Sequence, residues 1–224
     1  MVEATERREL SDATVLRLPS YLDALDSLRA RGVRGVSSEE LATAAGVTSA
    51  MLRKDLSQLG SLGVRGVGYE TEALRSQLMT ALGRDAVRPV VIVGLGRLGL
   101  AIASHGGFDG DGFEVVGLLD HDPQVVGTTV LGREVRDVRD LPQVVAVAGP
   151  GTIGVVATPG SAAQDVADLL VSAGVRAILT FAPTPLRVPE GIAVREVDLS
   201  CELRLLAYRS RAVAAHPTAG GVRA

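Results

Sequence analysis

Tryptophan is absent from this chain, and cysteine occurs once, at Cys201. A single cysteine excludes an internal disulfide framework and suits a reducing compartment, where it usually serves as a small buried hydrophobe. No run of about 18 apolar residues is present that could span a membrane. The charged N-terminus also lacks the apolar stretch of a signal peptide. We therefore expect a cytoplasmic protein that has no membrane partner.

Histidine is scarce as well, with His105, His121 and His216 the only examples. None of them lies in a pattern that pairs it with a catalytic acid. There is no Cys/His cluster with the spacing of metal ligands and no P-loop lysine pattern. The sequence therefore predicts no catalytic residue and no metal site.

The length and composition indicate two unequal globular domains. With 224 residues, 46% of them hydrophobic and 22% charged, the chain has room for one small and one mid-sized domain. The net charge is −3, yet residues 29–65 hold six basic and three acidic side chains. A basic window in an acidic chain permits contact with nucleic acid, although many solvated helical faces have the same composition.

The N-terminal part has the pattern of amphipathic helices. Residues 14–30 predict one helix, because leucines recur there at spacings of three and four (Leu18, Leu22, Leu25 and Leu28). Gly32 and Gly35 end this pattern. Ser37 and Glu40 then form a capping-box pattern, which predicts a short helix that ends near Ala45.

A second short helix and a hairpin complete a winged helix-turn-helix. Gly46 makes the turn, and Thr48 or Ser49 caps a helix that continues to about Leu59. Residues 62–70 are rich in glycine and β-branched residues, which predicts a tight β-hairpin. A further helix is expected within residues 70–83.

This arrangement suggests which side chains would read DNA. In a helix-turn-helix, the N-terminal residues of the second helix lie nearest the base edges. Here those residues are Thr48, Ser49, Ala50 and Arg53. Arg53 can contact guanine through two hydrogen bonds, while Lys54 suits a phosphate, and the glycine-flanked Arg65 suits a wing in the minor groove. Such helix pairs also serve as protein-docking or dimerisation modules, so that alternative stays open.

The rest of the chain predicts a parallel sheet covered by helices. Short apolar runs typical of buried strands occur at 88–94, 113–120, 153–158, 175–181 and 192–197. Helical stretches lie between several of them, and the clearest begins with a capping-box pattern of Ser161 and Gln164. We expect a winged-helix domain over residues 1–82 and a doubly wound, Rossmann-like α/β domain over 83–197. Residues 198–224 then form an amphipathic helix and, from His216, a disordered tail.

A glycine motif follows the first of these strands. Gly94, Leu95, Gly96, Arg97, Leu98 and Gly99 form a G-x-G-x-x-G that opens a helix. The first glycine allows a tight turn, the second lets the backbone approach a pyrophosphate, and the third allows close packing of helix and strand. Asp120 ends the next strand, about 20 residues further on, where an acid binds the ribose hydroxyls and repels a 2′-phosphate. These features favour NAD(H) over NADP(H) as the cofactor.

Other interpretations of this segment stay open. Asp122 is a weaker candidate for the ribose acid, and a glycine-rich turn can also bind another nucleotide or none. A nucleotide-binding enzyme subunit, dehydrogenase-like or CoA-binding, fused to a helical docking domain is the alternative function. Only about 25 residues follow the nucleotide fold, however, too few for a catalytic domain. We therefore expect a binding protein and not an enzyme.

The chain resembles a known family, the Rex redox-sensing transcriptional repressors. The matching stretches are RLPSYL (17–22), SAMLRKDLSQLG (49–60), GVRGVGY (63–69), VGLGRLG (93–99), GFEVVGLLDHDP (112–123), TFAPTPLRVPEG (180–191) and VDLSCELRLLAY (197–208). The resemblance implies a homodimer whose C-terminal helix swaps onto the partner's nucleotide domain. It also implies a repressor that binds a palindromic operator, senses the NADH/NAD⁺ balance and is released by NADH.

The resemblance carries residue roles to particular positions. Gly94 to Gly99 and Asp120 match the family's NAD(H) site. The positions around its nicotinamide end are Phe108, Thr158, Pro159, Ala182 and Pro183. Arg17 and Asp198 resemble a pair whose contact across the dimer changes with redox state.

The chain departs from the family pattern at four positions. A tyrosine that completes the redox switch is replaced by His105. Leu59 and Leu62 replace aromatic residues before the wing, which we interpret as changes within the core, and Thr180 replaces an asparagine.

Overall fold

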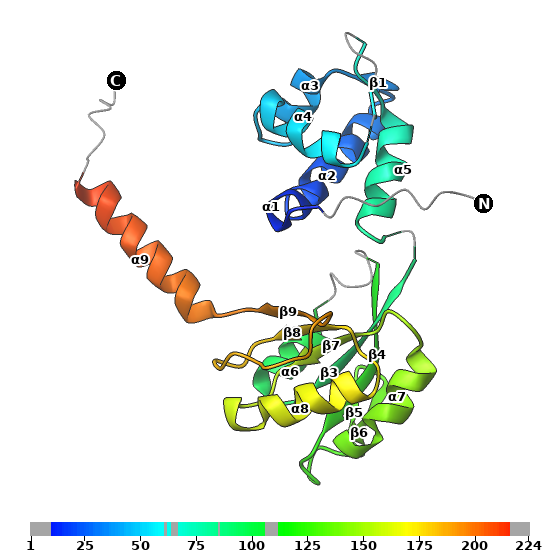
Figure 1. Cartoon of the computed structure of the whole chain (residues 1–224), viewed down its shortest axis with the longest axis vertical. Coiled ribbons are helices and arrows are strands. Elements are labelled where there is room, and N and C mark those ends of the chain that lie inside the picture. Colours follow the sequence, from blue (N-terminus) through cyan, green and yellow to red (C-terminus); the bar gives the residue numbers. More distant parts are fainter. Residues whose placement is uncertain (1–9, 61, 64–66, 85, 106–111, 216–224) are drawn as a thin grey trace. The chain divides into compact units, whose positions relative to one another are not determined.

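The computed structural model describes residues 10–60, 62–63, 67–84, 86–105 and 112–215, with side chains as far as Arg211. The chain divides into two compact units, residues 1–87 and 88–224, which are described separately (Figure 1). Among the described residues, no helix combines the length and the apolar composition needed to cross a membrane. The predicted roles of Arg65 and Phe108, and the tail from His216, lie outside the described residues.

The first unit is a helical domain with a small two-stranded sheet. Its elements are α1 (Asp12–Val15), α2 (Leu18–Ala30), β1 (Gly35–Val36), α3 (Ser38–Ala44), α4 (Ser49–Gln58), β2 (Tyr69–Glu70) and α5 (Thr71–Ala81). The predicted capping box is present, because the Ser37 side chain accepts from the N–H of Glu40 and the Glu40 side chain accepts from that of Ser37. Thr48 caps α4, which confirms the first of the two caps, Thr48 or Ser49, that the sequence predicts.

One prediction for this unit needs correction. The single helix expected over residues 14–30 is two helices, since Pro19 lies in the first turn of α2 and proline favours a helix start. Tyr69–Glu70 pairs antiparallel with Gly35–Val36, while residues 64–66, in the middle of the hairpin predicted over 62–70, lie outside the described residues. The small sheet therefore joins the segment before α3 to the segment before α5.

A leucine-rich core holds α2, α3, α4 and α5 together. Its fully buried members include Leu18, Tyr21, Leu22, Leu25, Leu41, Leu52, Leu56, Leu74 and Leu78. Leu59 and Leu62, the two replacements of family aromatics, pack against this core. Full burial of one such leucine contributes about 1.5–3 kcal/mol, so these contacts fix how α3 and α4 cross.

The second unit contains a seven-stranded sheet. Its elements are β3 (Arg88–Val93), α6 (Arg97–Ala103), β4 (Phe113–Asp120), β5 (Thr129–Val130), β6 (Arg133–Asp137), a 3₁₀ turn (Val138–Asp140), α7 (Leu141–Ala148), β7 (Ile153–Val156), α8 (Gly160–Ser172), β8 (Ala177–Thr180), β9 (Ala193–Glu196) and α9 (Leu199–Ala215). The strand order is β5-β6-β4-β3-β7-β8-β9, and only β5 is antiparallel to its neighbour. Without β5 this is the doubly wound order of dinucleotide-binding folds, as predicted.

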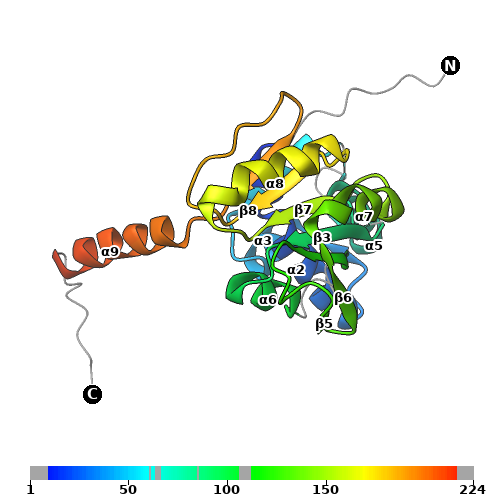
Figure 2. The same ribbon diagram turned by 90° about the horizontal axis from the view of Figure 1, so that it is seen from below.

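Both faces of the sheet are covered, which explains the continuous apolar strands. In β3, Val91 and Val93 belong to a buried cluster with residues of α7 and α8. Val90 and Ile92 belong to a second cluster that includes residues of α6. Figure 2 shows α7 and α8 on one side of the sheet and α6 on the other.

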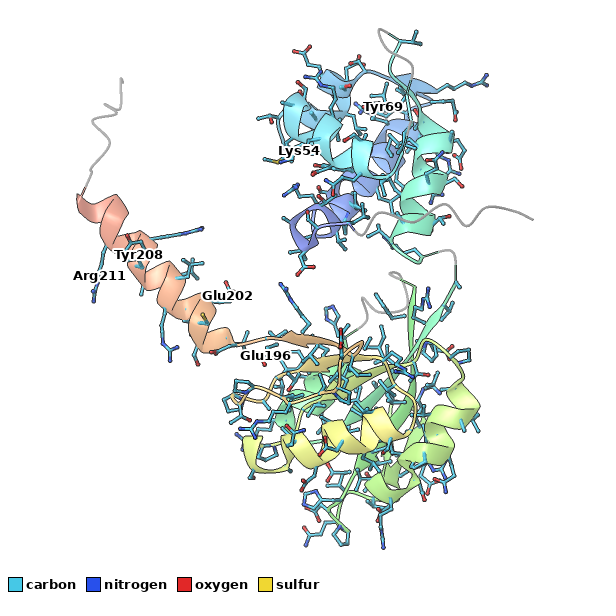
Figure 3. The ribbon with its side chains drawn as sticks, in the orientation of Figure 1. Lys54, Tyr69, Glu196, Glu202, Tyr208 and Arg211 are labelled. Carbon is cyan, nitrogen blue, oxygen red and sulfur yellow. The ribbon has the colours of Figure 1, made fainter. Side chains whose placement is uncertain are left out.

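The last helix differs from the others because it is not buried. Every described side chain of α9, from Leu199 to Arg211, is exposed. Leu203 is 66% exposed, Leu206 60% and Tyr208 73%. Figure 3 shows Glu202, Tyr208 and Arg211 on this helix.

Candidate functional site

The glycine loop at the end of β3 is closely packed at its first and third glycines. Gly94 has φ +94°, and a Cβ there would lie 2.8 Å from Cγ2 of Thr158. A Cβ on Gly99 would lie 1.8 Å from the carbonyl oxygen of Gly94. Gly96 differs, because a Cβ there would meet no atom within 4 Å. The loop thus keeps a strand and a helix in close contact and leaves open space beside its middle glycine.

The carboxylate of Asp120 holds this loop against β4. Its Oδ2 accepts from the backbone N–H of Leu95 at 2.6 Å, and its Oδ1 accepts from those of His121 and Asp122 at 2.7 and 2.9 Å. Burial raises the pKa of Asp120, but the three backbone donors outweigh burial and lower it overall. Asp122, the weaker candidate, caps the backbone N–H of Gln124. Asp120 is therefore the ionised carboxylate attached to the glycine loop.

The carboxyl ends of β3 and β7 meet at the point where the strand order reverses. The Ala157 N–H donates to the carbonyl oxygen of Val93 at 2.9 Å, which brings the next residue, Thr158, beside Gly94. The Thr158 hydroxyl is buried and has no hydrogen-bond partner among the described residues. Ligands of doubly wound sheets bind at this reversal point. The open space beside Gly96, the bound carboxylate and the unpaired hydroxyl fit a dinucleotide.

The segment after β8 lies next to the start of α8. A Cβ on Gly160 would lie 3.6 Å from Cδ of Pro183, and Ala182 is buried. Thr180, which replaces the family's asparagine, is fully buried and accepts from the Ala182 N–H at 3.1 Å. The structure thus brings Thr158, Pro159 and Pro183 to one end of the sheet.

The capping box predicted from Ser161 and Gln164 is wrong. The N-cap of α8 is Pro159, which makes no side-chain cap. The Gln164 side chain instead donates to the carbonyl oxygen of Arg187 and accepts from its N–H, both at 2.9 Å. This pair of bonds holds the segment after β8 against α8. In the sequence, Gln164 falls at a polar position of the helical pattern, so the pattern does not predict this contact.

The residues predicted to read DNA lie on the exposed side of α4. Ser49, in its first turn, is half-buried, while Ala50, Arg53, Lys54 and Ser57 are exposed (Figure 3 labels Lys54). Thr48 uses its hydroxyl to accept from the Met51 N–H. Among the described residues, no carboxylate lies within 4.0 Å of Arg53 or Lys54. The helix thus presents two cations without an acidic partner.

The three residues assigned to the redox switch occupy separate places. Arg17 forms an ion pair with Asp55 of α4. His105 is exposed, directly after α6. Asp198 precedes α9 and accepts from the N–H groups of Ser200 and Cys201. Their contact across a dimer stays a prediction.

Two family models match the chain in the order of its two units. Residues 9–57 match the model described as "Putative DNA-binding protein N-terminus", and residues 86–184 match the CoA binding domain model. The second match covers the glycine loop and the strands around it.

Curated relatives cover nearly the whole chain. The redox-sensing transcriptional repressor Rex of Streptomyces griseus is 53% identical over 216 residues, which is 96% of this chain and 85% of that protein. Rex of Thermus thermophilus is 44% identical over 200 residues, 89% of this chain and 93% of that protein.

Solved structures agree with this assignment. The crystal structure of RSP, described as a Rex-family repressor, in complex with β-NAD⁺ and operator DNA aligns with a TM-score of 0.84 at 36% identity. That alignment covers 92% of this chain and 95% of RSP. RSP in complex with β-NADH gives 0.77 at 35% identity, covering 92% and 96%. The chain belongs to the Rex family of redox-sensing transcriptional repressors.

Proposed function

We propose that this protein is a repressor that binds palindromic operator DNA as a homodimer and releases it on binding NADH. One observation carries the proposal: a single chain joins a dinucleotide cradle to a recognition helix whose two cations have no carboxylate partner in the part of the chain that the structure describes. RSP, which has the same fold, has been crystallised with operator DNA and β-NAD⁺, and separately with β-NADH. The protein would act in the cytoplasm, with the DNA that it binds.

The nucleotide cradle has a distinct part for each portion of the cofactor. The backbone of residues 94–99 would receive the pyrophosphate, and Asp120 the adenosine ribose. Thr158, Pro159, Ala182 and Pro183 would surround the nicotinamide, together with Phe108. The cofactor supplies a ring that is cationic when oxidised and neutral when reduced. Because burying a cation among apolar groups costs more than burying a neutral ring, this lining favours NADH.

The DNA-binding unit would place α4 in the major groove. Arg53 would contact guanine and Lys54 a phosphate, with Thr48, Ser49 and the wing residue Arg65 nearby. A palindromic operator requires two such helices at a spacing of one or more DNA turns. The exposed leucines of α9 support a dimer, since an uncovered apolar helix face is typical of an interface.

Release requires that the two cofactor states favour different arrangements of the dimer. A shift from about 99% bound to 99% free needs about 5.5 kcal/mol of differential binding, which two cofactor sites can share. We infer that Arg17, His105 and Asp198 carry part of this coupling. A cofactor that binds the DNA-bound and the DNA-free arrangement of the dimer equally well would not release the operator.

We infer a sensor and not an enzyme, because the curated relatives are named as repressors. The alternative is a nucleotide-binding enzyme subunit. A cofactor-turnover assay distinguishes them: a sensor leaves NADH unconsumed over hours, whereas an enzyme with its substrate oxidises it.

The proposal is tested by fluorescence anisotropy with a duplex selected from a random pool. NADH should lower the affinity for this duplex, and NAD⁺ should not. The Asp120→Ala variant is the matched control, since it should bind the duplex but respond poorly to NADH. A selected duplex that stays bound at saturating NADH would contradict the proposal.

A further inference from the structure

A buried carboxylate lies on the recognition helix, next in sequence to the exposed cation Lys54. Asp55 follows Lys54 in α4 and is 1% exposed. Its Oδ2 accepts from Nε of Arg17 and from the Tyr21 hydroxyl, both at 2.7 Å. Its Oδ1 accepts from Nη2 of Arg17 at 2.7 Å and from the Thr14 hydroxyl at 3.1 Å. Four directional bonds therefore join α4 to α1, to α2 and to Arg17, which precedes α2.

The electrostatics of this cluster keep the ion pair formed. The Arg17 hydrogen bonds lower the pKa of Asp55, and those from Tyr21 and Thr14 add to them, although burial opposes the shift. Burial and the bond to Asp55 raise the pKa of Tyr21 to about 12. The cluster thus consists of a carboxylate, a guanidinium and a neutral phenol at neutral pH.

A gain in the free energy of folding does not by itself explain why this buried ion pair is present. Replacement of a buried ion pair by apolar residues of similar volume is often neutral or stabilising, because desolvation offsets the attraction. The leucine core already holds α4, through Leu52 and Leu56. Hydrophobic contact is non-directional, however, whereas the two parallel bonds from Arg17 fix an orientation.

The cluster lies directly under the surface proposed to read DNA. A groove of about 400 Å³ between α1 and α4 has Thr14, Arg17, Thr48, Lys54, Asp55 and Gln58 in its lining. Gln58, one turn after Lys54, donates to the Thr14 hydroxyl at 3.0 Å and adds a second link from α4 to α1. The two residues that fix the helix, Asp55 and Gln58, thus follow the two cations within about one and a half turns of α4.

We propose that Asp55 is a positioning residue for operator recognition, whose bonds to Arg17, Tyr21 and Thr14 set the rotation of α4 about its axis. This inference rests on the proposed DNA-binding function. A rotation of about 20° moves a point about 6 Å from the helix axis by about 2 Å. That displacement exceeds what a base-specific hydrogen bond tolerates. Contacts to phosphates through a flexible lysine would survive it.

The experiment compares affinity for the operator, affinity for a random duplex and melting temperature across a series of variants. Asp55→Asn should reduce operator affinity by about tenfold or more, the size of one lost base contact, and random-duplex affinity by less than about twofold. Tyr21→Phe removes one bond to Asp55, and Thr14→Val removes one bond to Asp55 together with the bonds to Ser11 and Gln58. Neither variant removes a charge, and both should give smaller losses of the same kind. The double variant Arg17→Met with Asp55→Leu removes the pair without leaving a buried charge. It should recover the melting temperature but not operator affinity.

Three outcomes would overturn the inference. One is an equal loss for operator and random duplex in Asp55→Asn. Another is operator affinity that recovers with the melting temperature in the double variant. The third is unchanged operator affinity in Asp55→Asn, Tyr21→Phe and Thr14→Val, which would assign any loss in the double variant to the role of Arg17 in the redox switch. If the wild-type protein binds no DNA, the proposed function fails, which distinguishes that failure from a failure of this inference.

Discussion

The glycine loop allows two one-methyl substitutions, of which only one should reduce the stability of the fold. In Gly99→Ala the new Cβ would lie 1.8 Å from the carbonyl oxygen of Gly94. Because ordinary contacts begin near 3.4 Å, α6 must move by about 1.5 Å, at a cost of about 1–3 kcal/mol as in overpacked cores. In Gly96→Ala the methyl meets no protein atom within 4 Å, and φ is −64°, so folding should be unaffected.

Both variants should bind NADH poorly. Gly99→Ala displaces the N–H groups that would face the pyrophosphate, and Gly96→Ala places a methyl where the pyrophosphate would lie. Loss of two charge-assisted hydrogen bonds, at about 1.5–3 kcal/mol each, reduces affinity by about 100-fold or more. Both variants should therefore remain on operator DNA at NADH concentrations that release the wild type.

The assay combines urea unfolding, NADH titration by fluorescence and operator binding. Ala101→Ser, on the exposed side of α6, is the control and should match the wild type. Wild-type NADH affinity in Gly96→Ala would refute the placement of the pyrophosphate beside this glycine. Unchanged stability in Gly99→Ala would refute the close contact between α6 and β3.

Further predictions concern DNA reading and pH. Arg53→Ala should cost about 1–3 kcal/mol on the operator and relax base preference, while Lys54→Ala should weaken binding to all duplexes alike; equal losses on operator and random DNA for Arg53→Ala would remove it from base reading. If His105 takes the place of the family tyrosine in the switch, His105→Tyr should change the NADH concentration that releases the operator, and identical release curves for the two proteins would reject this role. Because the pKa of Asp55 is lowered in the folded state, its stabilisation is present above about pH 4 and lost as pH falls through the folded pKa. Urea unfolding between pH 6 and 3 should show a steeper loss in the wild type than in the double variant of Arg17 and Asp55, and parallel losses would contradict that.

Local signals predicted most of the elements. The capping box at Ser37 and the turn at Gly46 depend on contacts within a few residues, so the neighbouring residues are enough to predict them. The glycine loop and the acid that ends β4 likewise predicted the doubly wound order, because that geometry requires them in a fixed succession.

The elements that were missed lack a periodic apolar signal. β6 has one buried residue, Val135, among charged neighbours, and α7 is apolar except for Gln143, a pattern that does not distinguish helix from strand. The sequence also does not predict contacts between residues that are far apart along the chain. Arg17 and Asp55 lie 38 positions apart, and Gln164 and Arg187 lie 23 apart. Only the packed structure brings such pairs together.

Calorimetric titration of NADH into the protein, with and without saturating operator, tests the central claim most directly. Coupling between two sites is reciprocal, so operator should weaken NADH binding by the same factor by which NADH weakens operator binding. Equal NADH affinity in the two titrations would contradict the account, because no free energy would then connect the cofactor to the DNA.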